Sequence, residues 1–312
     1  MQRSDYDSPW KEIIEQFFPE FIAFFFPHIY NDIDWSRGYE FLDKELQKIV
    51  RDSQTGRKRV DKLVKVWRKN GEETWIGIHV EVQGQYERDF AQRMFQYNTL
   101  LYNHYQRRIV SLAILSDDRP DWRPDSFGYD LWGCKIQLDF PAVKLLDYKE
   151  KETELERDDN PFAVVVLAHL QAQATTPASA QRRDAKFRLV RRLYKRGYNR
   201  RRILELFRFI DWIMNLTAEL EADFQTAITK YEEAHNMQYV TAIERKGIEQ
   251  GIEQGMEQSM RDAILDVLTL RFEEVPAELP AQLDKITDIT RLKELHKWAV
   301  VEPSLEAFLT RL

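Results

Sequence analysis

The sequence contains a single cysteine, so no disulfide can form within the chain and no zinc site built on paired cysteines is possible. It also lacks the motifs GxxxxGK[ST], GxGxxG, HExxH and GxSxG, which leaves P-loop, dinucleotide-binding, zinc-peptidase and serine-hydrolase functions without support. No apolar run approaches the ~20 residues of a membrane helix, and the first residues lack a secretory signal. We therefore expect a cytoplasmic protein that does not cross a membrane.

The composition is that of a folded protein with a large core. Hydrophobic residues make up 43% of the 312 residues, including 8 Trp, 13 Tyr and 18 Phe, which is too apolar for a chain that is disordered throughout. The length predicts two or three structural units. The formal net charge is -6, so any basic surface must be local.

The first 150 residues alternate between helical and strand periodicity. Between Trp10 and Trp35 apolar residues recur at helical spacing, interrupted by two prolines, and a second helix is predicted from Tyr39 to Val50. The segments 60–67 and 75–83 then alternate with a period of two, which predicts a hairpin with a turn at Asn70-Gly71. A helix at about 90–106 and strands at 109–115 and 143–148 follow. This order predicts a mixed α/β fold, an α+β sheet flanked by helices.

The rest of the chain reads as helical. A charged link at 149–159 precedes it, and 171–179 is predicted to be a loop. The segment from Arg182 to Arg208 contains twelve Lys and Arg residues and only two acidic residues. From Gly247 to Ser259 a Gly-x-x-x repeat places small residues on one helical stripe. We divide the chain into a mixed α/β core at 1–150, a helical region with the basic segment at 151–235, and a helical tail at 236–312.

Two acids on the predicted hairpin form a candidate metal site. Asp61 lies on one arm and Glu81 on the other, and two carboxylates on adjacent strands can share Mg²⁺ or Mn²⁺, which prefer oxygen ligands. The backbone carbonyl of Val82 is a candidate third ligand. A two-residue loop at Asn70-Gly71 would pair Asp61 with Val80, on the wrong face. The metal hypothesis therefore predicts a register shifted by one residue, which sets Asp61 opposite Glu81.

These residues resemble a known family. Val60-Asp61, the run from Ile78 to Gln83 that contains Glu81, and the helical segment from Gln92 to Tyr97 are similar to the PD-(D/E)XK nuclease family transposases, the Rpn or recombination-promoting nuclease group. The resemblance covers residues 41–148, and the Gly-x-x-x-Gly tail is typical of the same group. It implies a restriction-endonuclease-like fold and a Mg²⁺-dependent DNA endonuclease related to DNA recombination and transposition.

The resemblance also implies roles for individual residues. Asp61 and Glu81 would be metal ligands, and Gln83 would stand where the motif usually has lysine, while Val60 replaces its proline. A glutamine can orient a water or a phosphate but cannot remove a proton. Glu45 is a candidate additional catalytic acid, with Asp43 and Glu40 as alternatives. His79, on the same polar row of the strand, is interpreted as a surface or supporting group rather than a ligand.

Candidate contacts to double-stranded DNA lie in two places. Arg93 and Tyr97 share one helix face, where they can contact phosphate or simply pack and pair. In the basic segment the candidates are Arg191, Arg192, Lys195, Arg200 and Arg201. Counterion release would drive DNA binding there, but the same segment can instead pair with acids of the chain, above all those of 150–159.

The Gly247–Ser259 helix is predicted to form a homo-oligomer, in the simplest form a homodimer, with packing within the chain as the alternative. Three hypotheses remain at this point. The first is a metal-dependent endonuclease, and the second is a catalytically inactive DNA-binding or protein-interaction module, which Gln83 motivates. The third is a purely structural oligomer organised by the tail helix.

Overall fold

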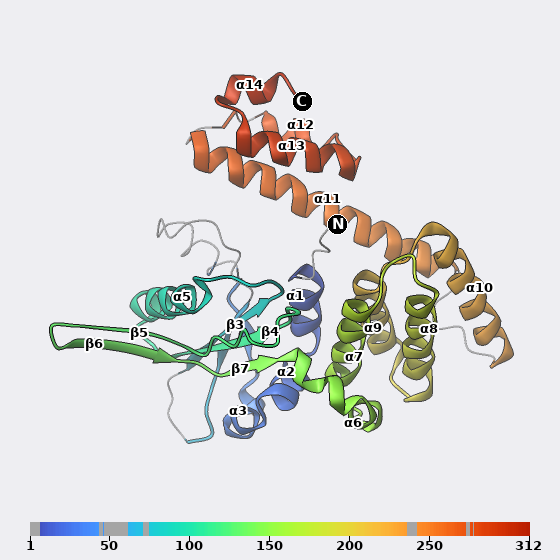
Figure 1. Cartoon of the computed structure of the whole chain (residues 1–312), viewed down its shortest axis with the longest axis horizontal. Helices are drawn as coiled ribbons and strands as arrows, with labels where there is room; N and C mark the ends of the chain where they lie inside the picture. Colours follow the sequence, from blue (N-terminus) through green and yellow to red (C-terminus); the bar gives the residue numbers. More distant parts are fainter. Residues whose placement is uncertain are drawn as a thin grey trace. The chain divides into compact units, whose positions relative to one another are not determined.

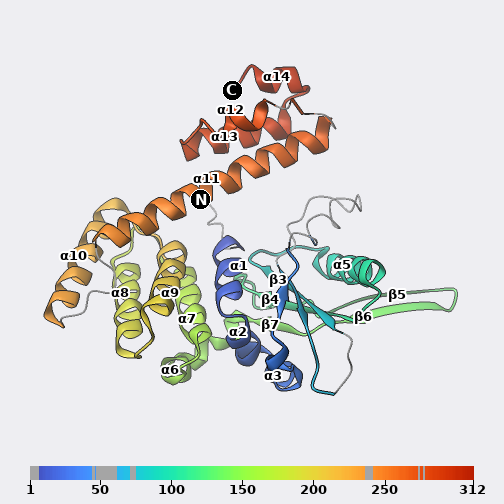
Figure 2. The same ribbon diagram turned by 180° about the vertical axis from the view of Figure 1, so that it is seen from behind.

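The computed structural model describes residues 7–43, 46, 62–70, 75–235, 242–272, 275–276 and 278–312, and for 7–8 and 242–254 the backbone alone. The chain forms two compact units, Met1–Tyr239 and Val240–Leu312. Figure 1 shows the elements along the chain, and Figure 2 shows them from behind. The fold is mixed α/β, with a five-stranded mixed sheet and many helices, as the sequence predicts.

The first unit begins with three short helices, α1 (Asp7–Gln16), α2 (Phe18–Phe25) and α3 (Pro27–Asp32). The breaks between them are those predicted from proline, because Pro19 lies in the first turn of α2 and Pro27 begins α3. Trp10 of α1 is fully buried and packs its ring against Phe25, Phe162 and Phe209. The aromatic residues of this region therefore join the amino-terminal helices to the later helices.

The sheet has the order β1-β2-β3-β4-β7. Its strands are β1 (Glu40–Phe41), β2 (Lys62–Val66), β3 (Ile76–Gln83), β4 (Ile109–Leu115) and β7 (Ala142–Lys144). β1 pairs antiparallel with β2, and β2 pairs antiparallel with β3. β4 runs parallel to β3, and β7 runs parallel to β4. The parallel step from β3 to β4 requires a crossover, which helix α5 (Phe90–Tyr105) supplies.

Helices cover both faces of this sheet. Lys62 of β2 pairs with Glu15 of α1, whereas the next residue, Leu63, packs with Tyr97 and Leu101 of α5. Because successive strand residues point to opposite faces, α1 and α5 lie on opposite faces. The core of the sheet is the apolar stretch of β4, where Leu112, Ala113 and Ile114 are fully buried.

Helices complete the first unit. After the 3-10 turn η2 (Leu145–Lys151) come α6 (Glu152–Arg157), α7 (Pro161–Ala174), α8 (Ala180–Lys195), α9 (Arg200–Ile213) and α10 (Ala218–Ala234). Helix α7 is buried almost all round and lies against α2 and α9, and α9 lies against α1. The residues predicted as a nuclease core and as a basic helical region thus share one compact unit.

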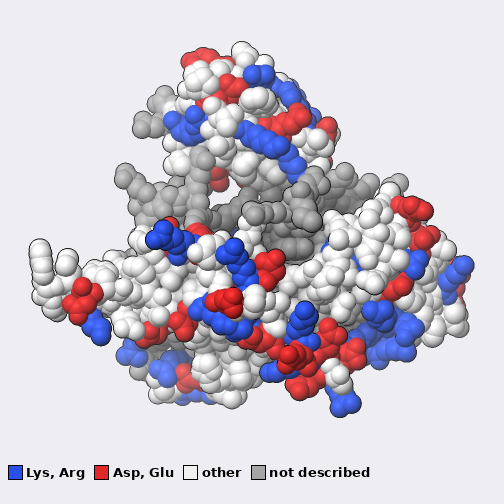
Figure 3. Space-filling model, in the orientation of Figure 1, with Lys and Arg blue, Asp and Glu red and all other residues white. Residues whose placement is uncertain are grey.

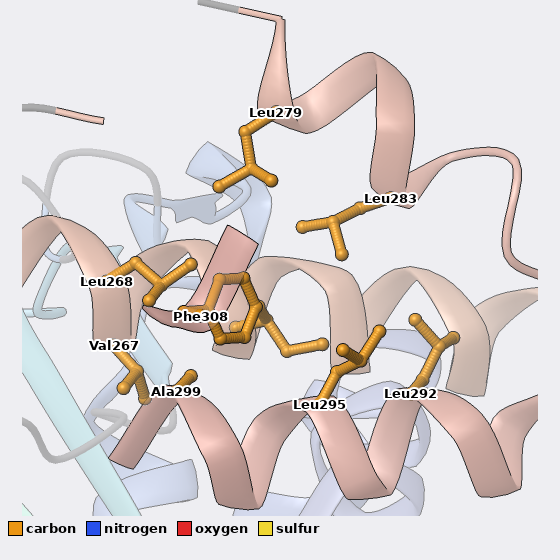
Figure 4. Packing of buried hydrophobic residues seen from close by; sticks show 9 residues of the cluster. Val267, Leu268, Leu279, Leu283, Leu292, Leu295, Ala299 and Phe308 are labelled. Atoms are coloured by element: carbon orange, nitrogen blue, oxygen red, sulfur yellow. The ribbon is translucent and has the colours of Figure 1, made fainter. Parts of the chain in front are cut away.

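The second unit is helical. It contains α11 (Ala242–Phe272), α12 (Leu279–Leu283), α13 (Ile289–Val301) and α14 (Leu305–Leu309). Figure 4 shows Val267 and Leu268 of α11 meeting Leu292, Leu295 and Ala299 of α13, with Phe308 between them. Among the described residues, the core of this unit includes Ile264, Val267 and Leu268 from the second half of α11. Among the helices that the structure describes, none combines the length and the hydropathy that a membrane span needs.

Several predicted elements differ from the structure. The segment predicted as a helix from Tyr39 begins instead with β1, because Phe41 pairs with Val64 at the sheet edge, and helical residues follow only from Asp43. The predicted strand at 143–148 ends at Lys144 and continues as η2. The predicted loop at 171–179 is shorter, since α7 continues to Ala174. The charged link contains α6, and the hairpin of β5 (Ser126–Leu131) and β6 (Cys134–Asp139) was not predicted.

A fully buried histidine makes the first unit sensitive to acid. Burial lowers the pKa of His169 to about 4. The hydrogen bond between its Nε2 and the Ser116 carbonyl raises the pKa, but by less than burial lowers it. The Nδ1 atom accepts from Trp10 Nε1 at 3.4 Å, so the ring is neutral. Because an unfolded histidine has a pKa of ~6.5, the unfolded state binds the proton first. Stability is therefore complete above about pH 6.5 and falls as the pH drops towards 4.

We expect this single group to cost about 3 kcal/mol of unfolding free energy between pH 7.5 and pH 4. The measurement is urea unfolding at both pH values for the native chain and for His169→Gln, in which the titrating group is absent. The variant is expected to lose about 3 kcal/mol less than the native chain over this interval. Equal losses in both proteins would contradict the assignment of a neutral, buried imidazole.

Candidate functional site

The candidate site lies where β3 ends beside α5. His79, Glu81 and Gln83 alternate along β3, and contacts to α5 show that this row faces that helix. Glu81 is 2% exposed and His79 is fully buried, so this row is not a solvated strand surface. Burial of a carboxylate without partners costs free energy, so its partners decide what it can do.

A chain of hydrogen bonds fixes Glu81 from one side. Asn98 of α5 donates to Ser111 Oγ at 3.1 Å, and Ser111 Oγ lies 3.2 Å from His79 Nδ1. On the other side of the ring, His79 Nε2 lies 3.1 Å from Glu81 Oε1. A carboxylate can only accept, so we assign the proton to Nε2 and let the Ser111 hydroxyl donate to Nδ1. In this arrangement His79 can orient Glu81, and its full burial shows that it is not the surface group that the sequence left as one interpretation.

Arg93 of α5 holds the other side of the row. Its Nη2 atom donates to Gln83 Oε1 at 2.7 Å and lies 3.6 Å from Glu81 Oε2, while Nη1 pairs with Glu87. The Gln83 amide also donates to the Gln85 carbonyl at 2.7 Å. The guanidinium therefore places a positive charge between Glu81 and Gln83, at a position where the sequence supplies only a neutral amide on the strand.

The register of the hairpin is the shifted one. Lys62 lies opposite Val80 and Val66 opposite Ile76, which is one residue away from the register that a two-residue loop at Asn70-Gly71 would give; residues 71–74 lie outside the described residues. The register that the metal hypothesis required is thus present over all of β2. Asp61 itself lies outside the described residues, as do Val60 and Glu45.

The alternatives to Glu45 occupy different ends of the hairpin. Asp43 accepts from Lys62 Nζ at 2.6 Å and from the Leu63 amide at 3.1 Å, and so lies at the start of β2, next to the position of Asp61 in the sequence. Glu40 pairs with Lys65, farther along β2 and away from Glu81. Of these two described acids, Asp43 lies closer along β2 to the level of Glu81, but its partner Lys62 points to the α1 face, opposite to the face that carries Glu81.

The donor chemistry of the site suits a hard cation, although the described residues supply only part of it. A carboxylate from Glu81 and a backbone carbonyl from Val82 are oxygen ligands of the kind that Mg²⁺ prefers. Within the described ranges no group of three or more His, Cys, Asp or Glu side chains is placed to share a metal ion. The predicted ligand set is complete only with Asp61, so the metal site stays a prediction.

The predicted DNA contacts are placed differently from one another. Arg93 is 8% exposed and Tyr97 is 1% exposed, with Tyr97 packed edge-on against the His79 ring. Both thus face the sheet, where packing and ion pairing, the second interpretation, describe their contacts. Arg191, Lys195, Arg200 and Arg201 are exposed on α8 and α9, and Arg192 is half-buried. Contact with DNA stays a prediction for all of them.

Much of the basic segment contacts acids or carbonyls of the chain. Arg192 and Arg196 donate to the carbonyls of Leu155 and Glu156, Arg202 pairs with Glu20, and Lys186 pairs with Asp211 and Glu221. On the face drawn in Figure 3, Lys and Arg are interspersed with Asp and Glu in the first unit. The alternative interpretation, pairing with the segment at 150–159, accounts for part of the positive charge.

The predicted tail helix is present as the first half of α11. A Cβ atom added at Gly255 would meet no described atom within 4 Å, so this glycine does not mark a close helix contact within the second unit. Self-association through the glycine stripe is untested and stays a prediction. The side chains of the earlier tetrads lie outside the described residues.

Two features of the site were missed in the sequence. Asn98 and Ser111 complete the chain of hydrogen bonds to His79, and the signal for Ser111 was a lone hydroxyl within the apolar strand IVSLAIL.

In comparisons with family models, with curated proteins and with solved structures, nothing matches this chain.

Proposed function

We propose that this chain is a metal-dependent DNA endonuclease with a restriction-endonuclease-like fold, of the Rpn or PD-(D/E)XK transposase type. The observation that carries the proposal is the register of β2 and β3, with Lys62 opposite Val80. If this pairing continues by one residue, Asp61 lies opposite Glu81 on the same face. Two carboxylates so placed can hold one divalent cation.

The residues of the chain have distinct parts in this proposal. Asp61, Glu81 and the Val82 carbonyl hold Mg²⁺ or Mn²⁺, which supplies an activated water and stabilises charge on the phosphodiester. His79 keeps the Glu81 carboxylate oriented through the hydrogen bond at 3.1 Å. Gln83 orients water or phosphate, and Arg93, which donates to Gln83, provides the nearby positive charge. Glu45 or Asp43 supplies an additional acid.

Double-stranded DNA is the proposed substrate. The exposed cations of α8 and α9 would neutralise phosphates, and a homodimer would bring two sites to one duplex, which suits cutting of both strands. The biological setting that the family resemblance suggests is DNA recombination or transposition. In this proposal the Gly247–Ser259 half of α11 contributes to self-association.

A specific observation favours the second candidate function, a catalytically inactive DNA-binding or protein-interaction module. Both ends of the Gln83 amide are occupied, since Oε1 accepts from Arg93 and Nε2 donates to the Gln85 carbonyl. An amide held by these two partners has less capacity to bind a water or a phosphate than the lysine of the motif has. This chain would then keep the fold without the reaction.

Supercoiled plasmid distinguishes the two functions. The purified chain is incubated with plasmid in Mg²⁺, in Mn²⁺ and in EDTA, beside an Asp61→Ala, Glu81→Ala double variant prepared in parallel. Metal-dependent nicking or linearisation that the double variant lacks is the expected result. Equal traces for both proteins, together with DNA that still shifts in a gel, would exclude the nuclease and support the binding module.

A further inference from the structure

The hairpin of β5 and β6 has one apolar and one polar face. Across the two strands, Phe127 pairs with Leu138, Tyr129 with Ile136 and Leu131 with Cys134, whereas the alternate pairs are polar or small. At the end of the hairpin away from the turn, the apolar face is covered, since Phe127 packs on Phe95 of α5. Its outer half is not, because Tyr129 is 49% and Leu131 56% exposed. Figure 1 shows the hairpin reaching away from the sheet.

The tip of the hairpin carries an unusual residue. Trp132 is 97% exposed and has a φ of 54°, and Gly133 follows with a φ of 83°. A turn with two positive φ values favours Asn-Gly, and a bulky residue there is strained. Turn stability therefore does not explain the tryptophan, whereas an apolar partner surface would.

The outer edge of β6 is open for pairing. Among the strands that the structure describes, β6 pairs only with β5. Leu131 and Cys134 flank the two-residue turn, so Cys134, Ile136 and Leu138 direct their backbone groups to β5, and Lys135, Gln137 and Asp139 direct theirs outward. An open edge of this kind is a template for another strand.

We infer that β6 pairs antiparallel with β6 of a second copy of this chain, about a two-fold axis at Gln137. Side chains of directly opposite residues lie on one face, so a symmetric register must be centred on a residue. Of these registers, only the one centred on Gln137 sets Lys135 opposite Asp139 of the second copy, twice by symmetry. Ile136 then lies opposite Leu138 of the second copy.

Charge and position both favour this occupant. Lys135 is the only cation of the hairpin, beside Asp130 and Asp139, so the hairpin does not attract nucleic acid phosphates. The register also places Cys134 opposite Phe140 of the second copy. Phe140 belongs to an apolar cluster with Phe90, against which Leu138 packs. The resulting four-stranded sheet is independent of the proposed nuclease activity.

Disulfide trapping in the full chain tests the register. In a Cys134→Ser background, Gln137→Cys brings two thiols together at directly opposite positions, whose Cα atoms lie ~5.5 Å apart, within disulfide range. The matched control Lys135→Cys places the thiols about four residues apart along the strand, beyond reach. We expect at least tenfold more cross-linked dimer from Gln137→Cys than from Lys135→Cys. Equal yields would overturn the inference.

A charge exchange in the Gln137→Cys background provides the second test. Lys135→Asp alone and Asp139→Lys alone each place like charges opposite each other across the axis, and each is expected to lower the cross-linking yield about tenfold. The two together restore opposite charges and are expected to return the yield to within twofold. This rescue cannot arise inside one hairpin, because Asp130 still faces the new Asp at position 135 in the double variant.

Other occupants give different results, each of which would overturn the inference. If the hairpin binds DNA, Trp132→Ala weakens the DNA gel shift and leaves cross-linking unchanged. If it binds a lipid surface, phosphatidylcholine and phosphatidylserine vesicles protect Trp132 from an aqueous quencher and the charge exchange has no effect. Far-UV circular dichroism of every variant confirms that the chain is folded in each comparison.

Discussion

Replacing Glu81 by glutamine is expected to lower Mg²⁺-dependent nicking of plasmid DNA by a factor on the order of 10³. The amide keeps the size of the side chain and can still accept a hydrogen bond from His79 Nε2, which lies 3.1 Å from the carboxylate. It lacks the negative charge that holds a hard cation. The loss therefore falls on metal binding and on the chemical step, and an initial-rate assay across a Mg²⁺ titration measures both.

Glu87→Gln is the matched control for this experiment. Glu87 also pairs with Arg93, but it lies beyond the end of β3 and is not among the predicted metal ligands. Its replacement removes one negative charge from the same guanidinium and is expected to cost less than about tenfold in rate. Similar rates for the two variants would assign the effect to the Arg93 network and would contradict a metal site at Glu81.

The strands of the candidate site were predictable from different signals, since β3 alternates with a period of two and β4 is apolar throughout except for Ser111. Strand β4 has the predicted bounds, and β3 begins one residue later than predicted. The register was not predictable from periodicity, since a shift of one residue preserves the alternation and exchanges the two faces. It followed only from combining the pattern with a requirement of chemistry, that Asp61 and Glu81 face the same cation.

The hairpin of β5 and β6 shows a different limit. Its sequence, SFGYDLWGCKIQLD, alternates as strands do, but Trp-Gly is not a favoured turn pair, so the turn gave no signal. A turn that departs from the preferred sequence is expected where another contact selects the residue. The unpredicted element is thus the one that carries the proposed contact with a second copy.

The basic segment was identified by counting charges, yet a count cannot locate them. Arg182 and Lys186 belong to it, and both are buried, at 3% and 1% exposure. Arg182 donates to the Ala172 carbonyl of α7 and to Asn215 after α9, which ties α8 to both neighbouring segments. Only the helix face on which each residue falls separates the structural cations from those that can meet DNA.

Lys186 is the structural cation whose loss is expected to matter most. Its Nζ atom lies 2.6 Å from Asp211 and 2.9 Å from Glu221, and it lies over the Phe224 ring at 4.6 Å. Burial alone would lower the pKa of Lys186. The two carboxylates raise it by more than burial lowers it, so the pKa is above its usual value. The amine is charged at neutral pH, and its contribution to stability is lost only as the pH rises through that raised pKa.

Lys186→Met is expected to lower the unfolding free energy of the first unit by about 3–5 kcal/mol. The substitution keeps the apolar stem but leaves Asp211 and Glu221 facing each other without a cation. Urea unfolding followed by tryptophan fluorescence measures the effect, because seven of the 8 tryptophans precede Val240 and report on the first unit.

The triple variant Lys186→Met, Asp211→Asn, Glu221→Gln separates the two sources of this loss. With all three charges removed, no uncompensated carboxylate remains, and most of the stability is expected to return. If Lys186→Met alone were within about 1 kcal/mol of the native chain, the three groups would be too hydrated to depend on one another. If the triple variant were as unstable as the single one, the ammonium would act by more than neutralising its two partners. The expected recovery assigns to Lys186 the neutralisation of two carboxylates, Asp211 of α9 and Glu221 of α10, which is a structural part rather than a contact with DNA.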